Sequence, residues 1–257
     1  MLSLSNSVLK INSSATITMS ALANRLRSEG KDIISLSAGE PDFGTPEHVK
    51  EAAIEAIKAG ETKYTNPDGM PELKEVISQK FATENNLKYE PSQISVGTGG
   101  KQIIYNALMA TLNPKDEVII PAPYWVSYPD MVKLAGGIPK IIKTASRNNY
   151  KVQPNDLRAS LTENTKWLIF NSPSNPTGAA YTVKELKMLT DVLLEFPKVN
   201  ILSDDIYEHI TFGKFKFVTP AEVEPKLYPR TLTCNGLSKG YAMTGWRIGF
   251  AGGPEKI

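Results

Sequence analysis

The segment at 235–249 places a lysine among small residues and an arginine eight positions later (Asn-Gly-Leu-Ser-Lys-Gly-Tyr-Ala-Met-Thr-Gly-Trp-Arg-Ile-Gly). An amine in a turn with apolar neighbours loses its proton easily and can attack a carbonyl carbon, which makes Lys239 a candidate nucleophile. The planar guanidinium of Arg247 suits a phosphate group. A lone lysine is more often a solvated side chain, so this interpretation depends on the rest of the sequence.

Two adjacent carboxylates, Asp204 and Asp205, follow the apolar run 200–202 after Ser203, and Tyr207 comes soon after them. Open α/β sheets hold their ligands outside the carboxyl ends of the strands, which is where these side chains would lie. Taken alone, either carboxylate is most simply explained as a helix cap.

A turn at 171–178, Asn-Ser-Pro-Ser-Asn-Pro-Thr-Gly, follows another apolar run. Two prolines and a glycine mark a sharp turn, and nothing more is needed to explain them. Asn175 is its candidate functional residue. The Asn175–Pro176 bond is a candidate cis bond, since cis bonds concentrate at X–Pro in tight turns.

A glycine-rich turn, Gly-Thr-Gly-Gly-Lys at 97–101, lies between a strand-like run and a helical pattern. Glycines let the backbone approach an anion, and the N-terminus of the next helix offers free N–H groups. The spacing matches neither the dinucleotide fingerprint nor the P-loop. Trp125 offers a flat face for a cationic ring, or is an ordinary core aromatic.

These segments require an α/β scaffold to bring them together. Apolar runs at 94–96, 117–120, 139–142, 167–170, 200–202 and 231–234 predict buried strands, with a strand-like run at 247–251. Helical patterns begin at 45–47 and continue to Ile57, and others lie at 71–82, 101–112, 128–134 and 183–196. Alternation of the two kinds predicts α/β layers around a mainly parallel sheet.

Composition excludes several classes of protein. The 257 residues carry a net charge of only +2, so neither nucleic acid nor a membrane surface is an expected partner. Cys234 is the only cysteine, which leaves no internal disulfide and no thiolate zinc cluster, and we expect no metal site. No apolar run approaches the roughly 20 residues of a membrane span. A cytoplasmic location is the simple expectation.

The segment at 235–249 resembles the cofactor-lysine signature of class I aminotransferases, pyridoxal 5'-phosphate (PLP) enzymes of fold type I. The resemblance extends from about Ser14 to the last residue, includes the segments above in family order, and is closest to the bacterial aspartate aminotransferase branch. It implies a three-layer α/β/α fold with a mainly parallel mixed sheet. It also implies an N-terminal arm and the start of a small domain at 1–40, and a large PLP-binding domain at 41–257.

The resemblance assigns roles to these residues. Lys239 would hold PLP as a Schiff base and move a proton, Asp204 would pair with the protonated pyridine nitrogen, and Tyr207 and Asn175 would bond the phenolic oxygen. The remaining positions are assigned to the phosphate or ring (Gly99, Gly100, Lys101, Trp125, Ser238 and Arg247), to the substrate (Gly39, Trp125 and Asn175) and to the phosphate of a neighbouring subunit (Tyr64). Tyr64 thus implies a homodimer with shared active sites.

Three departures from the family pattern stand out. Asp205 replaces a usual glutamate, which we expect to matter little. Gly236 replaces a phosphate-binding serine, which would leave more of the anion to Ser238 and Arg247. The chain ends at Ile257, before the family's carboxylate-binding arginine. We therefore expect a fragment that lacks most of the small domain, binds PLP weakly and does not turn over.

The implied reaction moves an amino group between an amino acid and a 2-oxo acid, with aspartate and 2-oxoglutarate as first choice. Relatives that accept prephenate tend to carry a basic residue where this chain has Asn12, which argues against prephenate. Aromatic or alanine aminotransferases, C–S β-lyases, cyclising synthases and an inactive PLP-binding fragment stay open. A transcription regulator is disfavoured because no basic domain precedes Ser14. The serine-rich start could be a transit peptide, but Ser14 onward fits the family.

Overall fold

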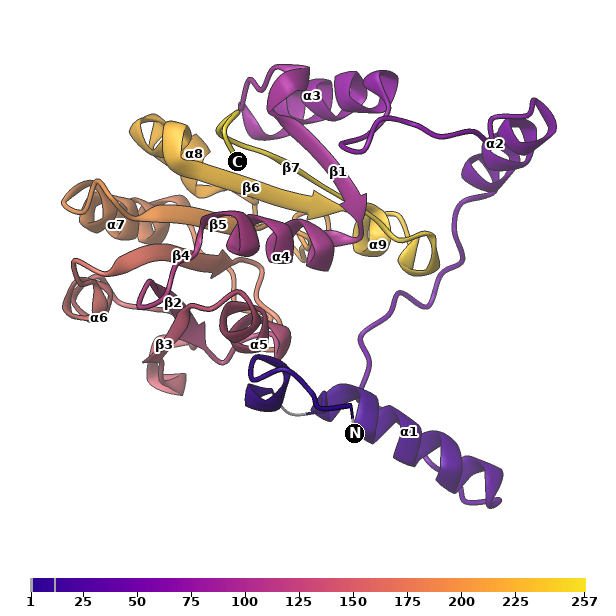
Figure 1. The fold of residues 1–257 in the computed structure, drawn as a ribbon, viewed down its shortest axis with the longest axis horizontal. Helices are drawn as coiled ribbons and strands as arrows, with labels where there is room; N and C mark the ends of the chain where they lie inside the picture. The colour runs from indigo at the N-terminus through magenta and orange to yellow at the C-terminus, as the bar shows by residue number, and fades with distance from the viewer. Residues whose placement is uncertain (1, 12) are drawn as a thin grey trace.

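A computed structural model describes residues 2–11 and 13–257, and its centre is one seven-stranded sheet (Figure 1). The spatial order of the strands is β1-β7-β6-β5-β4-β2-β3. Strand β7 runs antiparallel to both of its neighbours, and the other pairs are parallel. The strands are β1 (Ile94–Thr98), β2 (Glu117–Ala122), β3 (Ile138–Lys143), β4 (Thr165–Asn171), β5 (Asn200–Asp204), β6 (Thr231–Gly236) and β7 (Ile248–Gly252). The expected mixed, mainly parallel sheet is confirmed.

The helices are α1 (Ala15–Ser28), α2 (Glu47–Lys58), α3 (Pro71–Asn85), α4 (Gly100–Thr111), α5 (Ser127–Leu134), α6 (Pro154–Ser160), α7 (Val183–Leu194), α8 (Pro220–Val223) and α9 (Leu237–Gly240). The five expected helices, α2, α3, α4, α5 and α7, are confirmed to within a few residues, whereas α1 was not expected. Short 3₁₀ turns lie at Val8–Lys10, Pro91–Gln93, Ser146–Asn148, Pro225–Arg230 and Thr244–Trp246.

Both faces of the sheet are covered, because successive residues of its strands point to opposite sides. In β2, Val118 and Ile120 pack with α4 and α5 in one core cluster, whereas Ile119 packs with α6 and α7 in another. A third cluster joins α3 to Phe250 of β7. The result is the expected α/β/α arrangement, with its polar segments left at the carboxyl ends of the parallel strands.

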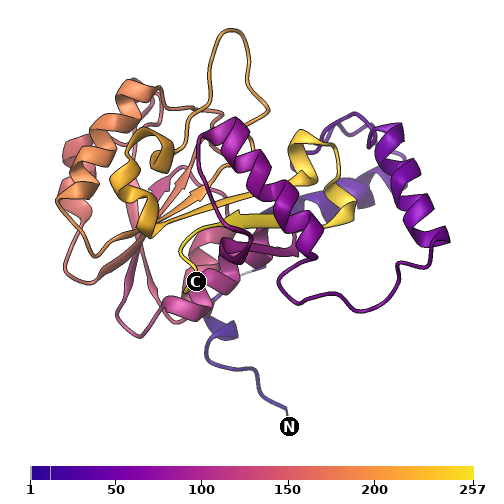
Figure 2. The same ribbon diagram turned by 90° about the horizontal axis from the view of Figure 1, so that it is seen from above.

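Helices α1 and α2 lie apart from the sheet, joined to it by extended chain (Figures 1 and 2). Ala23 is the buried residue of α1, and α2 has none, although Ile54 and Ile57 of α2 carry apolar side chains. The predicted division at residues 40 and 41 stays a prediction. None of the helices in the described parts of the chain combines the length and apolar character that a membrane crossing needs.

Candidate active site

The candidate residues gather where β4, β5 and β6 end and where β1 turns into α4. Asn171 ends β4, Asp204 ends β5, and Gly236 ends β6 just before the short helix α9, which carries Ser238 and Lys239. Neighbouring parallel strands deliver their carboxyl ends to one edge, which is why segments far apart in sequence meet there.

Asp204 is a buried carboxylate with a specific donor. The hydroxyl of Tyr128, from α5, donates a hydrogen bond to Asp204 Oδ2 at 2.6 Å. The backbone N–H of Ile206 lies 3.4 Å from Oδ1. Burial raises the pKa of Asp204, and the Tyr128 hydrogen bond opposes that rise. A carboxylate held this way gains from a cationic partner, which would offset its loss of hydration.

Asn171 connects the 171–178 turn to β5. Its amide donates to the carbonyl oxygen of Asp204 at 2.8 Å, and its Oδ1 accepts the backbone N–H of Asn175, also at 2.8 Å. Asn175 Nδ2 in turn lies 3.4 Å from the hydroxyl of Tyr207. The two residues predicted to bond the same cofactor oxygen therefore lie side by side, and their bonds to that oxygen stay a prediction. The Asn175–Pro176 bond is cis, as are Ala122–Pro123 and Ser172–Pro173.

Lys239 projects from α9 and donates a hydrogen bond to the carbonyl oxygen of Gly39. Burial lowers the pKa of Lys239, the nearby Glu40 carboxylate opposes that change, and Arg247 adds to it. More of this amine is therefore neutral at a given pH than for a solvated lysine. Because only a neutral amine attacks a carbonyl, this environment suits the predicted nucleophile.

The guanidinium of Arg247 lies directly against Gly99. A Cβ added at Gly99 would lie 2.3 Å from Arg247 Nη2, and Gly99 has φ of +80°, so only glycine fits there. Arg247 itself has a left-handed backbone, with φ 58° and ψ 55°, a costly conformation that persists mainly at functional sites. The first N–H groups of α4, at Gly100 and Lys101, complete a place for an anion.

Trp125 is half-buried beside this place. The ammonium of Lys101 lies 4.9 Å from the centre of the Trp125 ring, and Trp125 meets Tyr128 edge-on at 5.4 Å. The Lys101 side chain thus contacts the indole, while its backbone N–H belongs to the first turn of α4. These contacts fix Trp125 next to the residue that holds Asp204.

A family model described as aminotransferase class I and II matches residues 31–257. The chain belongs to this family. It is 59% identical over 254 residues to the aspartate/prephenate aminotransferase of Cereibacter sphaeroides. This match covers 99% of this chain and 64% of that protein. Its fold matches the crystal structure of the Rhizobium meliloti aspartate aminotransferase with a TM-score of 0.97 at 52% identity, over 100% of this chain and 64% of that one.

A second solved structure, the Thermus thermophilus aspartate aminotransferase with maleate, matches with a TM-score of 0.95 at 45% identity. It covers 100% of this chain and 66% of that one. The expected fold type I and the resemblance to the aspartate aminotransferase branch are therefore confirmed. The chain spans 64% to 66% of the length of these three relatives.

The glycine that replaces the family's serine has a structural reason in this aminotransferase chain. A Cβ at Gly236 would lie 2.8 Å from the carbonyl oxygen of Ile248 and 3.3 Å from the Cα of Gly249. Both neighbours are backbone atoms of β7, so a side chain at 236 would push the strand away. Ser238 is buried in the next turn, and its contribution to the anion site stays a prediction.

The structure leaves one predicted site residue outside this cluster. Tyr64 lies between α2 and α3 and is fully exposed, so it adds nothing to the site of its own chain. Its predicted role in a neighbouring subunit stays a prediction. Asn12, the residue used to argue against prephenate, lies outside the described residues.

Two positioning residues escaped the sequence analysis. The sequence placed Tyr128 only in a predicted helix and Asn171 only in a predicted turn. The backbone N–H of Tyr128 bonds the carbonyl oxygen of Trp125 at 3.0 Å in the turn that opens α5, but the contact of Tyr128 with the distant Asp204 has no signal in the local sequence.

The departure at Asp205 has a visible cost. Asp205 is buried, Ser203 donates to its Oδ1 at 2.6 Å, and its Oδ2 has no hydrogen-bond partner among the described residues. Burial raises the pKa of Asp205 to about 7, the Glu208 charge adds to that rise, and Ser203, Thr219 and Lys80 oppose it. Whether the shorter side chain matters to function stays a prediction.

Asp205 gives a pH-dependent prediction. Because the folded-state pKa of Asp205, about 7, exceeds the ordinary carboxyl pKa of 3.8, its protonation stabilises the fold fully below about pH 4, and that contribution is lost as the pH rises through about 7. Asp205→Asn removes this pH-dependent loss of stability, because an amide does not ionise. In urea unfolding of the cofactor-free protein, the variant should gain stability relative to the original chain between pH 4.5 and 7.5. A pH-independent difference would contradict this account.

Proposed function

We propose that this chain carries the PLP-binding site of an aminotransferase. The observation that supports this most strongly is the joint geometry of three groups: the Lys239 amine, the buried Asp204 carboxylate, and the Arg247 guanidinium against Gly99. The residues present fit this cofactor, because they offer an anion-binding place, a carboxylate for a ring nitrogen and an amine whose pKa burial lowers. Bound PLP would supply an aldehyde carbon and a cationic ring that accepts electrons.

The chain's own residues have distinct tasks in this proposal. Arg247, Ser238 and the first N–H groups of α4 hold the phosphate. Asp204 keeps the ring nitrogen protonated, and Tyr128 keeps Asp204 ionised. Burial raises the pKa of Tyr207, so its hydroxyl stays a neutral donor at neutral pH; Asn175 lies beside it. Trp125 covers the ring, and Lys239 moves the proton at the substrate Cα.

Aspartate with 2-oxoglutarate is the proposed substrate pair. A cavity of about 320 Å³ lies between the start of α1 and α5, and Ser13, Ser14 and Lys101 line it. Asp130 also lines it but is paired with Lys133 at 3.4 Å. Among the described residues that line this cavity, Lys101 brings a positive charge that no carboxylate pairs with, although its ammonium also lies 4.9 Å from the centre of the Trp125 ring. Lys239, Asp204 and Arg247 do not line the cavity. The three relatives reported above are all named for aspartate, which supports aspartate as the amino donor, and one of them is also named for prephenate.

The remaining proposals concern the whole protein. We propose a homodimer in which Tyr64 of one chain reaches the phosphate of the other, and in which the backbone of Gly39 meets the substrate carboxylate. A cytoplasmic location belongs to the same proposal. The buried thiol of Cys234, which forms no disulfide, and the bacterial origin of the relatives are compatible with it.

The covalent role of Lys239 has a direct test. Borohydride reduction of the protein with PLP should leave a stable adduct on Lys239, found by peptide mapping. Lys239→Ala should give no adduct, because the alanine has no amine and the ammonium of Lys101 is engaged with the Trp125 ring. Lys101→Ala is the matched control and should still be labelled at Lys239. An adduct on another lysine, or none, would overturn the proposal.

Tyr128→Phe tests the support of Asp204. The change removes the hydrogen bond that lowers the pKa of Asp204, so its carboxylate is lost at a higher pH than before. PLP binding should weaken about tenfold at neutral pH, the worth of one hydrogen bond to a charged group, and more at lower pH. Tyr89→Phe is the control, since Tyr89 is a buried tyrosine bonded to Thr233 at 2.9 Å. Equal effects of the two variants would refute this role.

Substrate choice is tested with isotopically labelled amino acids. In a chain as long as its relatives, aspartate plus 2-oxoglutarate should yield glutamate and oxaloacetate, and prephenate should be a much poorer amino acceptor. Pyruvate and ammonia from a cysteine-type substrate would instead indicate a β-lyase. If single-turnover experiments detect no transfer while the Lys239 adduct still forms, the chain is a PLP-binding fragment rather than an enzyme.

A further inference from the structure

Beside the candidate site, the buried carboxylate of Glu208 directly follows Tyr207 in sequence. Its side chain is only 3% exposed. Glu208 Oε1 pairs with the ammonium of Lys80 and accepts a hydrogen bond from Asn235 Nδ2 at 2.7 Å. Oε2 accepts from Asn85 Nδ2 at 2.9 Å. A buried carboxylate with three partners from two other elements, α3 and β6, holds those elements in register.

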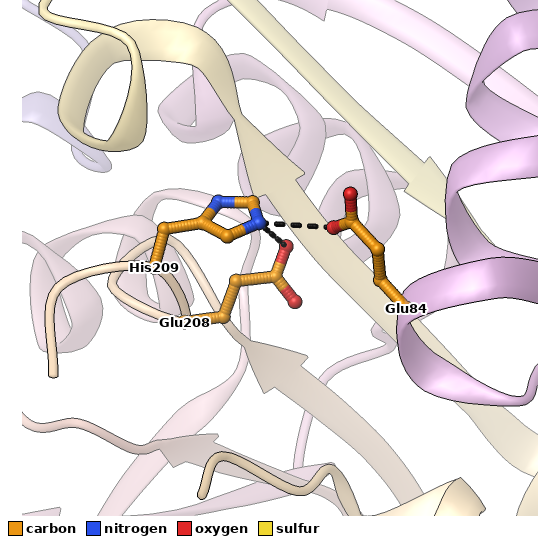
Figure 3. A group of neighbouring side chains, drawn as sticks. All are labelled: Glu84, Glu208 and His209. Atoms are coloured by element: carbon orange, nitrogen blue, oxygen red, sulfur yellow. Dashed lines mark hydrogen bonds and ion pairs between the residues drawn. The ribbon is translucent and has the colours of Figure 1, made fainter.

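His209 and Glu84 extend this group toward solvent (Figure 3). His209 Nε2 lies 2.9 Å from Glu84 Oε2 and 3.7 Å from Glu208 Oε1. Two carboxylates and an imidazole at this spacing resemble a metal site. However, Lys80 contacts Glu208 and lies 3.5 Å from Glu84, so a cation already balances the group. The arrangement is better explained as a network internal to the protein.

The side chain of Asn235 connects the network to the turn that carries Lys239. Asn235 donates to Glu208 through its Nδ2, and its Oδ1 accepts the backbone N–H of Gly236 at 2.7 Å. Gly236 is the residue from which α9 begins, and α9 carries Lys239. Two hydrogen bonds therefore separate the Glu208 carboxylate from the start of the turn that presents the amine.

His209 supports the same turn from its other end. A Cβ added at Gly240, directly after Lys239, would lie 2.9 Å from His209 Nδ1, so ring and backbone are in close contact. His209 also meets the ring of Tyr241 edge-on at 5.8 Å. The Lys239 turn is thus held at Gly236 through Asn235 and at Gly240 by His209, with Glu208 behind both supports.

We propose that Glu208 is a positioning residue that sets the orientation of the Lys239 turn for covalent attachment of the cofactor. This inference rests on the function proposed above. Glu208 does not touch the cofactor place itself; it acts through Asn235, with Lys80 supplying the charge that lets the carboxylate stay buried. A purely stabilising role would affect folding but would not distinguish ligands that attach to Lys239 from ligands that do not.

The test compares two ligands on Glu208→Gln. PLP has an aldehyde and attaches to Lys239, whereas pyridoxamine 5'-phosphate shares its ring and phosphate but cannot attach. Misplacing a reacting group lowers its effective concentration, so covalent attachment should weaken by about tenfold. Binding of pyridoxamine 5'-phosphate, followed by protein fluorescence, should change less than about twofold because ring and phosphate contacts remain.

Two further variants make the result decisive. Asn235→Ala cuts the link to Gly236 but keeps the Lys80–Glu208 pair, and it should show the same selective loss even if Glu208→Gln does not fold. Glu117→Gln is the matched control, because Glu117 is also buried and pairs with Lys140 at 3.1 Å and Thr162 at 2.7 Å, at the opposite end of the sheet. It should lower thermal stability without changing the ratio of the two ligands' affinities.

The possible outcomes separate the two proposals. If the unaltered protein does not attach PLP, the proposed function fails. If it attaches PLP and both Glu208→Gln and Asn235→Ala leave the ratio of the two affinities unchanged, the positioning role is wrong and the function stands. If the affinities for both ligands fall by the same factor in these variants, Glu208 only stabilises the fold, and the inference is also overturned.

Discussion

The site depends on a backbone contact between β7 and the turn that joins β1 to α4. A Cβ at Gly249 would lie 2.3 Å from the backbone of both Gly99 and Gly100, so only two glycine-lined segments can approach this closely. Strand β7 is the antiparallel member of the sheet and lies between β1 and β6. The residue just before β7, Arg247, is thereby brought to Gly99, while the end of β6 delivers Lys239 beside it.

The candidate site therefore has a positive end and a negative end. Arg247 and the first turn of α4 favour an anion at one end. Buried Asp204, supported by Tyr128, favours a cation at the other. Lys239 lies near the positive end, and both burial and Arg247 lower its pKa, which makes the amine reactive. A phosphate-bearing cationic ring matches this distribution of charge. A nucleotide matches it less well, because the glycine-rich turn at 97–101 has the spacing of neither a P-loop nor a dinucleotide fingerprint.

The sequence predicted the sheet well because its strands are continuous apolar runs buried on both faces, as in 118–120 of β2. Helix α1 escaped prediction because Ala23 is its buried residue and its apolar side chains are largely exposed. Short α6 escaped because a proline-started helix of seven residues shows too little periodicity. Roles that depend on contacts between distant segments were also missed: Tyr128 with Asp204, Asn171 with β5, and Glu208 with α3 and β6 have no local signature. Lys239, Asp204 and Asn175 could be assigned because a family pattern fixes them.

The central claim is that Asp204 holds a protonated ring nitrogen in the same place where Lys239 binds the aldehyde carbon. The most direct measurement is the ¹⁵N NMR spectrum of ring-labelled pyridoxal 5'-phosphate bound to the protein. The account predicts the chemical shift of a protonated pyridinium nitrogen, and its conversion to the unprotonated value in Asp204→Asn with the cofactor still attached. An unprotonated nitrogen in the unaltered protein, or a shift that the Asp204 change leaves the same, would contradict it.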